Sequence, residues 1–468
     1  MEPKLRVLME LHPCFYGFSG IPQETRLLFS IFSDLNNIKL TGLLDANRTS
    51  NTADINGLSN FILATLDSAN FSDIDRFRTN LNVAARIASI ILKNLLGVKI
   101  PIASFNSHGF EDFLWERLFA KTLTTQDFTK ITNAAYCLLG LSRITMSIAV
   151  LSNIFLKINT KEHQVFIAQT PFPGRISKNT QLIVRYHDAI PVFVPHLIDN
   201  PRSHQALHYK SLCDNAETAY FACTSNTVRN DLLQMFPKLE QRSVVIHDII
   251  SPHYFIETTT TAHLAEIINN YAHAEWRQPL SSDTFSYLLM ASTIEPRKNH
   301  IRLIRAWELV RNKLNLNIKL VLVGELGWQT EPVLAVMRPW QQRGQLFHLQ
   351  QVPVEYLRLL YTGAACVVCP SVKEGFDLSG IEAMACGSIV AASDIAVHRE
   401  VYETAAIYFD PYSFTTQADV IECILGYDDA SVKMHRQHGL QQAQKYQPHV
   451  IKSKWENLFL ALNTDKIQ

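Results

Sequence analysis

Residues 286–300 read SYLLMASTIEPRKNH. An apolar run with the composition of a buried strand comes first, and a polar turn follows it. Beyond the turn, apolar residues recur at helical spacing at Ile301, Ile304, Trp307 and Val310. The order strand, turn, helix is the repeating unit of a parallel sheet that is covered by helices.

The same unit recurs along most of the chain. Further runs with strand character are 6–11, 40–44, 165–168, 182–186, 220–224 and 243–247 in the first half, and 319–324, 346–349, 365–369, 389–393 and 406–409 in the second. Two such sets predict two sheets. We therefore expect an α/β protein with two doubly wound, Rossmann-like domains.

The segment between the two sets of strands gives the domain boundaries. It is rich in turn residues at both ends, and so we place a linker at 257–283, a first domain at 1–256 and a second domain at 284–447. Residues from about 46 to 164 do not alternate cleanly and are predicted to be a helical insertion in the first domain. Residues 448–468 are predicted to form a C-terminal helix that crosses back to the first domain.

The composition excludes several classes of protein. Of the 468 residues, 47% are apolar, which is enough for a folded core. Because 43 basic residues balance 43 acidic ones, no net charge attracts the chain to nucleic acid. The eight cysteines are scattered, which is typical of reduced thiols. Cys366 and Cys369 lie in an apolar run, and this favours a core strand over a redox or zinc site.

One long apolar stretch raises the question of a membrane. Residues 132–156 contain a single charged side chain, Arg143, and the span exceeds the ~20 residues that a membrane helix needs. The central arginine disfavours insertion, so we favour buried helices, with shallow membrane docking and true spanning as alternatives. The apolar run near the N-terminus is interrupted by Arg6 and Glu10, unlike a signal peptide. We therefore expect a cytoplasmic protein, and leave open a peripheral contact at the inner face of the membrane.

Ligands of doubly wound sheets bind where strands end, so functional residues are expected directly after the strands. The glycine patterns of dinucleotide-binding and Walker-type sites are absent from these positions. Arg297 and Lys298 instead follow a strand directly, and a guanidinium beside an ammonium suits a diphosphate, although such pairs are often merely solvated. Glu374 and Glu382 follow another strand and suit a ligand rich in hydroxyls, although Glu382 could simply stabilise a helix start.

These two segments together resemble the retaining family 4 glycosyltransferases of GT-B fold. The resemblance implies that the two Rossmann-like domains face each other across a cleft. In that family a Glu-Pro-Arg-Lys-Asn turn and two glutamates spaced like Glu374 and Glu382 mark a nucleotide-sugar site. Further segments that resemble the family are the glycine loop 17–20, the turn 185–191, the helix start 224–232 and the loop 393–401. Residues 324–331 are similar to mannosyltransferase members. No motif is recognisable in about 46–164.

The resemblance implies a role for each matching residue. Arg297 and Lys298 would bind the diphosphate, Glu382 the ribose hydroxyls and Glu374 the hydroxyls of the donor sugar. His187 would lie near the anomeric carbon. The remaining donor-binding positions are Gly20 in the glycine loop and the loop and helix start formed by Gly375, Phe376, Asp377, Leu378 and Ser379.

Three positions depart from the family pattern. Asp377 stands where glycine is more common, and Ser379 and Ser388 stand where proline is more common. A carboxylate at position 377 could alter the choice of sugar, or it could simply point outward.

The resemblance implies a hexosyltransferase that uses no metal or other cofactor. The donor would be a GDP- or UDP-sugar, with GDP-mannose favoured, and the acceptor a glycan or lipid-linked saccharide of the kind used in polysaccharide biosynthesis. Two alternatives stay open: a non-catalytic protein that binds nucleotide sugars or carbohydrates, and a sugar-nucleotide epimerase of the same fold.

Overall fold

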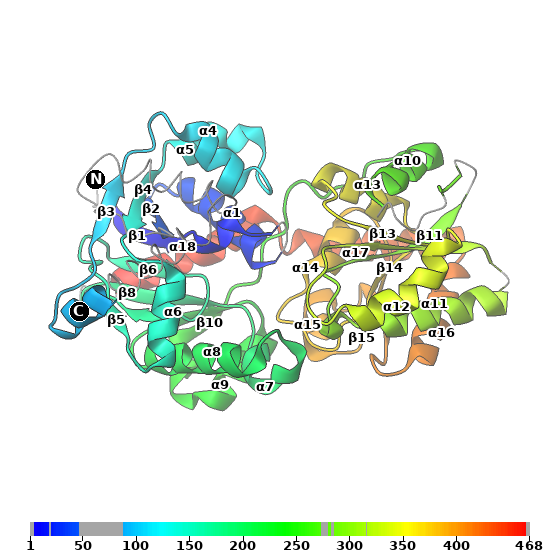
Figure 1. Cartoon of the computed structure of the whole chain (residues 1–468). Coiled ribbons are helices and arrows are strands. Elements are labelled where there is room, and N and C mark those ends of the chain that lie inside the picture. Colours follow the sequence, from blue (N-terminus) through cyan, green and yellow to red (C-terminus); the bar gives the residue numbers. More distant parts are fainter. Residues whose placement is uncertain are drawn as a thin grey trace, which may run out of the picture.

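Figure 1 shows the computed structural model, which describes residues 4–17, 20–45, 88–272, 279–281, 285–314 and 316–464. The chain forms two α/β domains, as predicted. Residues 46–87 of the predicted insertion lie outside the described residues, as do 273–278 and 282–283 of the predicted linker and residue 284 of the predicted second domain.

The first sheet has the strand order β10-β9-β8-β6-β1-β2-β4-β3. Its strands are β1 (Leu5–Glu10), β2 (Ile38–Asp45), β3 (Ile102–Phe105), β4 (Ala135–Leu139), β6 (Val165–Ala168), β8 (Gln181–Tyr186), β9 (Tyr220–Cys223) and β10 (Ser243–Val245). All pair in parallel except β3, which runs antiparallel to β4 at the edge. The helices that cover the sheet include α1 (Ile21–Ser33), α6 (Arg143–Leu151), α8 (Pro201–Asn215) and α9 (Asn226–Met235).

The second sheet is entirely parallel, with the order β13-β12-β11-β14-β15-β16. Its strands are β11 (Ser286–Ala291), β12 (Ile318–Val323), β13 (Leu346–Leu349), β14 (Cys366–Cys369), β15 (Val390–Ser393) and β16 (Ala406–Phe409). One face packs on α11 (His300–Leu314), α12 (Glu331–Gln342) and α16 (Phe414–Leu425). The other face packs on α10 (Thr261–Tyr271), α13 (Val354–Gly363), α14 (Leu378–Ala385) and α17 (Asp429–Gln444). Every strand predicted from the sequence is present.

The prediction of a helical insertion is wrong for the described part, 88–164. This part contributes β3 and β4 to the first sheet, together with the helices α4 (Glu111–Leu114), α5 (Phe128–Thr132) and α6. The apolar stretch 132–156 is therefore a strand followed by a helix rather than buried helices alone. A run of five apolar residues fits either a strand or a buried helix, and periodicity alone does not separate them. Among the described residues, every helix is too short or too polar to cross a bilayer.

The last helix, α18 (Pro448–Thr464), packs against the first domain. Its Trp455 and Phe459 meet the ring of Phe32 on α1, with ring centroids 5.1 and 5.4 Å from it. The chain therefore passes between the domains twice, once after β10 and once before α18. The two passages touch, because the amide of Ile250 donates a hydrogen bond to the carbonyl of Tyr446 over 3.0 Å.

Candidate active site between the domains

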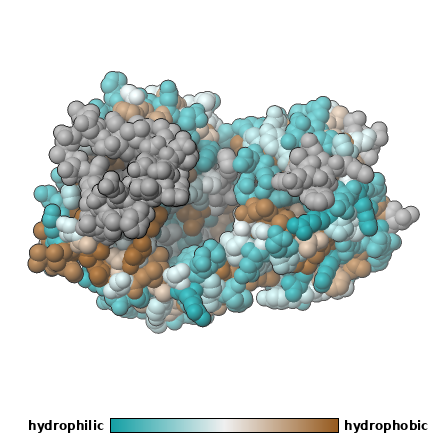
Figure 2. Space-filling model, in the orientation of Figure 1, coloured by the Kyte–Doolittle hydropathy of each residue, from teal (hydrophilic) through white to brown (hydrophobic). Residues whose placement is uncertain are grey.

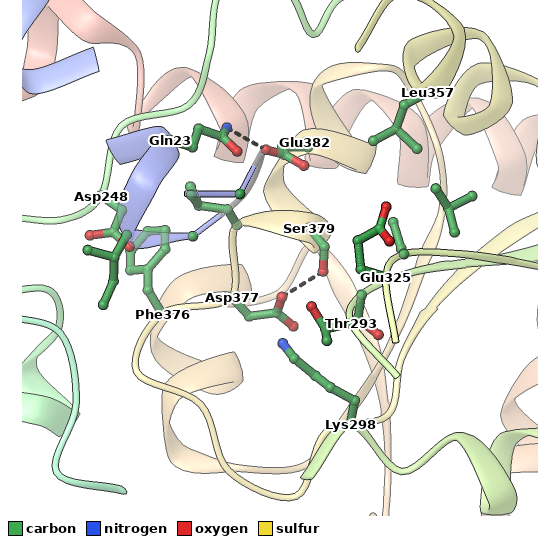
Figure 3. A pocket seen from close by; sticks show the side chains of 18 of the residues that line it. Gln23, Asp248, Thr293, Lys298, Glu325, Leu357, Phe376, Asp377, Ser379 and Glu382 are labelled. Carbon is green, nitrogen blue, oxygen red and sulfur yellow. Dashed lines mark hydrogen bonds between the residues drawn. The ribbon is translucent and has the colours of Figure 1, made fainter. Parts of the chain in front are cut away.

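A cavity of about 550 Å³ lies between the two domains, at the carboxyl ends of strands from both sheets (Figure 3). Every site residue predicted from the sequence lines it. These residues are Gly20, His187, Arg297, Lys298, Glu374, Gly375, Phe376, Asp377, Leu378, Ser379 and Glu382. Residues that are distant in the sequence thus converge on one space of the size that small-molecule ligands occupy.

The basic pair lies in a short, rigid turn. Residues 296–298 form one 3₁₀ turn, and Asn299 follows in the left-handed region with φ of 65°. The Asn299 amide donates to the carbonyls of Pro370, over 3.0 Å, and Pro411, over 2.8 Å. Asparagine tolerates this backbone region better than most residues, and its side chain here fastens the turn to the loops after β14 and β16.

Arg297 and Lys298 both pair with Glu374. Lys298 Nζ lies 2.6 Å from Glu374 Oε1, and Arg297 Nη1 donates to the other carboxylate oxygen. Arg297 Nη2 also lies 2.6 Å from Glu295 Oε1. Burial alone would raise the pKa of Glu374, but the two cations outweigh burial and lower it below the ordinary value. The cavity wall thus carries a buried, ionised carboxylate between two fixed positive charges.

The loop after β14 lies against the first domain. Gly375 approaches the backbone of His187 so closely that a Cβ on residue 375 would lie 2.0 Å from the His187 carbonyl oxygen. Ser225 Oγ donates to the Gly375 carbonyl over 2.9 Å. The Phe376 ring packs against His247 and Tyr446, at centroid distances of 5.8 and 5.2 Å. The first amides of α14 face this loop region, and helix N-termini attract anions.

Glu382 joins the second domain to α1 of the first. Gln23 Nε2 donates to Glu382 Oε1 over 2.8 Å, as Figure 3 shows, and Tyr361 lies at the other oxygen with its hydroxyl 3.4 Å away. Burial raises the pKa of Glu382 to about 7, because desolvation and the nearby Asp377 outweigh these hydrogen bonds. This carboxyl can therefore gain or lose a proton near neutral pH.

His187 follows β8 and rests on a buried charged cluster. Its Nδ1 lies 3.5 Å from Glu24 Oε2, while its Nε2 is buried without a hydrogen-bond partner. Burial lowers the pKa of His187 to about 4, so the imidazole is neutral at physiological pH. Arg185 pairs with two carboxylates of this cluster. It contacts Glu24, and its Nη2 lies 2.7 Å from Asp248 Oδ1.

The sequence did not predict Gln23, Glu24 and Asp248 as site residues. Glu24, His187 and Asp248 offer ligand atoms within 4.8 Å of one another, the spacing of a metal site. Arg185 pairs with both carboxylates. Burial and the neighbouring Glu24 raise the pKa of Asp248 well above its ordinary value, which reduces the negative charge that Arg185 has to offset. The one sequence feature that could have indicated these residues is their place directly after a strand or at the start of a helix. Asp248 follows β10, and Gln23 and Glu24 lie in the first turns of α1.

Asp377 points into the protein, which excludes the outward orientation considered from the sequence. Its side chain is 4% exposed. Ser379 Oγ donates to Asp377 Oδ1 over 2.6 Å, and His398 Nε2 lies 3.0 Å from Oδ2. The third unusual position, Ser388, is buried with its hydroxyl donating to the Tyr361 carbonyl.

Comparison with known proteins agrees with this geometry. Residues 273–438 match the family model described as glycosyl transferases group 1. The O-antigen chain mannosyltransferase B of Escherichia coli is 27% identical over 277 residues, which are 59% of this chain and 67% of that protein. The serotype-specific mannosyltransferase WbdA of E. coli is 33% identical over 136 residues, which are 29% of this chain but only 16% of that protein.

Solved structures resemble the whole chain. Anabaena Alr3699/HepE, solved in complex with UDP-glucose, has a TM-score of 0.60 at 12% identity, covering 98% of this chain and 100% of that one. Sucrose-phosphate synthase from Thermosynechococcus elongatus has a TM-score of 0.58 at 14% identity, covering 99% and 100%. At these identities the likeness concerns the fold, which is the two-domain GT-B arrangement.

Proposed function

We propose that this chain, a glycosyltransferase of GT-B fold with a group 1 second domain and homology to O-antigen mannosyltransferases, transfers mannose from GDP-mannose to a growing glycan or lipid-linked saccharide. One observation carries the proposal. Arg297, Lys298, Glu374 and Glu382, which come from separate turns of the second domain, line one cavity against the first domain.

The chemistry follows from where charge develops. When the bond between the sugar and the diphosphate breaks, negative charge grows on the leaving phosphate and positive charge grows on the sugar ring. Arg297, Lys298 and the amides at the start of α14 stabilise the leaving group more in the transition state than in the ground state. No residue role in this scheme requires a metal ion.

The carboxylates and His187 orient the donor. Glu374 accepts hydrogen bonds from sugar hydroxyls while it stays paired with the two cations. Glu382 accepts from the ribose hydroxyls, a role that favours its ionised form. His187, whose imidazole is neutral, lines the cavity and contacts the sugar near the reacting carbon. Closure of the cavity excludes water and protects the sugar from hydrolysis. We propose that the anomeric configuration is retained.

The test is donor binding and turnover. Guanosine and uridine diphosphates and their hexose conjugates are screened by thermal shift. A ligand that binds only the native state raises the melting temperature of the protein. Release of GDP is then measured with and without saccharide acceptors, and the anomer of the product is assigned by NMR. We expect release that depends on acceptor and is lost in Glu374→Gln and Lys298→Ala. Binding without release supports the non-catalytic alternative, and conversion of the donor without acceptor supports the epimerase.

We also propose a peripheral contact between the first domain and an anionic membrane surface. Apolar side chains are exposed on α6, namely Ile144 at 60%, Ile148 at 60% and Leu151 at 38%. A second group, Leu92, Leu95, Leu96 and Val98, is more than half exposed on and after the helix over 88–95. Brown side chains gather at this end of the first domain in Figure 2. Lys93 and Lys99 are exposed beside the second group and would bind anionic headgroups.

Vesicle sedimentation tests this contact. Wild type should sediment with vesicles of phosphatidylglycerol and phosphatidylcholine, and much less with phosphatidylcholine alone. Ile148→Glu should reduce sedimentation several-fold. Leu309→Glu is the matched control, because Leu309 is a 39% exposed residue of α11 in the second domain. Equal sedimentation of both variants would contradict the contact.

A further inference from the structure

Asp377 and His398 form a buried pair at the wall of the donor cavity. The side chains are 4% and 0% exposed, and Asp377 Oδ2 lies 3.0 Å from His398 Nε2. Asp377 has a φ of 70°, a region that suits glycine far better than aspartate. A non-glycine residue held in this backbone region at a binding site is a reason to look for a functional role.

The surrounding hydrogen bonds fix the protons of the pair. Ser393 Oγ donates its one proton to the Ser371 carbonyl over 2.5 Å. His398 Nδ1 lies 2.9 Å from the Ser393 carbonyl, which can only accept, so Nδ1 carries a proton. One further proton lies between Nε2 and Asp377. Burial would raise the pKa of Asp377, but the bond to His398 and the charge of Lys298 lower it well below the ordinary value. Asp377 is therefore the ionised member of the pair.

Other contacts hold the pair in place. His398 stacks on Tyr402 with ring centroids 5.0 Å apart, and the Tyr402 hydroxyl donates to the Asp377 carbonyl over 2.9 Å. Ser379 donates to Oδ1 over 2.6 Å. Figure 3 shows the Asp377 carboxylate directed at Ser379 and toward the end of the Lys298 side chain, beside the cavity. Each carboxylate oxygen has accepted one hydrogen bond and has a lone pair left.

We infer that Asp377, positioned by His398, selects the sugar of the donor. It accepts a hydrogen bond from a sugar hydroxyl and rejects donors whose sugar carries a carboxylate. The inference rests on the proposed nucleotide-sugar function and deepens it. Without Asp377, the start of α14 and the ammonium of Lys298 would together favour an anion at this point. The internal carboxylate occupies this electropositive position and leaves a site for neutral sugars.

Binding measured by calorimetry on the full chain tests the inference. The probes are GDP-mannose against GDP-mannuronic acid and UDP-glucose against UDP-glucuronic acid, which differ only by a carboxylate in place of a hydroxymethyl group, together with GDP and UDP alone. The variants are Asp377→Asn and Asp377→Gly. The glycine variant also suits the backbone at φ of 70°, so it is expected to fold.

Wild type should bind the neutral donor of the preferred base at least tenfold more tightly than the acidic one. Both Asp377 variants should reduce this ratio at least fivefold. His398→Gln, whose amide can still donate to Asp377, should keep the ratio within threefold of wild type, whereas His398→Ala should lose it. A purely structural role would not change the ratio.

Three results overturn the inference. The selective role of Asp377 is wrong if the wild-type ratio is near one. It is also wrong if both Asp377 variants leave the ratio unchanged while the free diphosphate still binds. In either case the proposed function stands. Failure of wild type to bind either free diphosphate removes the proposed function, and the inference falls with it.

Discussion

Glu400 of α15 (Ala396–Tyr402), in the second domain, accepts two hydrogen bonds from Thr227 in the first turn of α9, in the first domain. The amide of Thr227 lies 2.9 Å and its hydroxyl 3.0 Å from Glu400 Oε2. Asn226 donates to the other oxygen from its backbone and its side chain. A carboxylate of one domain thus accepts hydrogen bonds from the first backbone amides of a helix in the other domain. These bonds favour the arrangement in which the domains are closed around the cavity.

Glu400→Ala should therefore open the domains. A hydrogen bond to a charged group contributes about 1.5–3 kcal/mol, so we expect the closed population to fall about tenfold or more. Small-angle X-ray scattering should show a larger radius of gyration, and the donor KM should rise. Glu422→Ala is the control, because Glu422 pairs with Lys313 inside the second domain. An unchanged radius for Glu400→Ala would show that closure does not depend on this contact.

Gly375→Ala should also keep the domains apart. The added methyl group would lie 2.0 Å from the carbonyl oxygen of His187, which is backbone and cannot turn away. The second domain itself should fold normally, so the melting temperature should change little while transfer activity falls at least a hundredfold. In Gly426→Ala the new Cβ would lie 3.5 Å from its nearest neighbour, an ordinary contact, and activity should be kept. Full activity of Gly375→Ala would contradict the closed geometry.

Arg297→Ala should raise the donor KM and lower kcat. The lost guanidinium faces the leaving diphosphate in our proposal, and its effect grows as the leaving group ionises. Arg305→Ala, an exposed arginine on α11, is the matched control and should behave like wild type. The assignment of Arg297 would be abandoned if both kinetic constants of Arg297→Ala stayed within twofold of wild type.

The stability of the protein should depend on the proton of Glu382. The folded state raises the pKa of this buried carboxyl from an ordinary 4.5 to about 7, and so it binds the proton more tightly than the unfolded chain does. The contribution of Glu382 to the free energy of unfolding should therefore be highest below pH 4.5 and fall as the pH rises to about 7. The shift corresponds to about 3 kcal/mol.

Urea denaturation of wild type and Glu382→Gln across pH 4.5 to 8 measures this effect. The variant has no proton to lose at this position, so the difference in unfolding free energy between the two proteins should change by about 3 kcal/mol over this range. A constant difference would mean that Glu382 keeps its ordinary pKa. Nucleotide affinity should rise over the same interval in wild type, because ribose hydroxyls need the ionised carboxylate as an acceptor.

The sequence predicts much of the fold because the strands of the two sheets are short, apolar and regularly separated. It fails at β4, whose five residues lie between helical segments and carry no period that distinguishes strand from helix. At the edge, β3 is only partly buried, which removes the apolar signal altogether.

The sequence predicts the residues that follow strands in recognisable motifs, and all of them reach the cavity. It misses contacts that exist only once the domains meet. Gln23 donates a hydrogen bond to Glu382, although the two residues are 359 positions apart in the sequence. No local sequence pattern predicts such a pair. His398 lies within a segment that resembles the family, but the sequence does not show that its ring contacts the carboxylate of Asp377.

The hydrogen bond between Ile250 and Tyr446 ties the two passages of the chain together between the domains. A domain joined to its neighbour by one segment can rotate in any direction. A domain joined by two adjacent segments rotates mainly about the line that passes through both. The domains should therefore open mainly about this line. Glu400 lies beside the line, because His247 is 3.4 Å from Glu400 and its ring packs on Tyr446 with centroids 5.4 Å apart. Donor and acceptor would enter from the side of the cavity that is far from this line, and the pivot side would stay shut throughout the cycle.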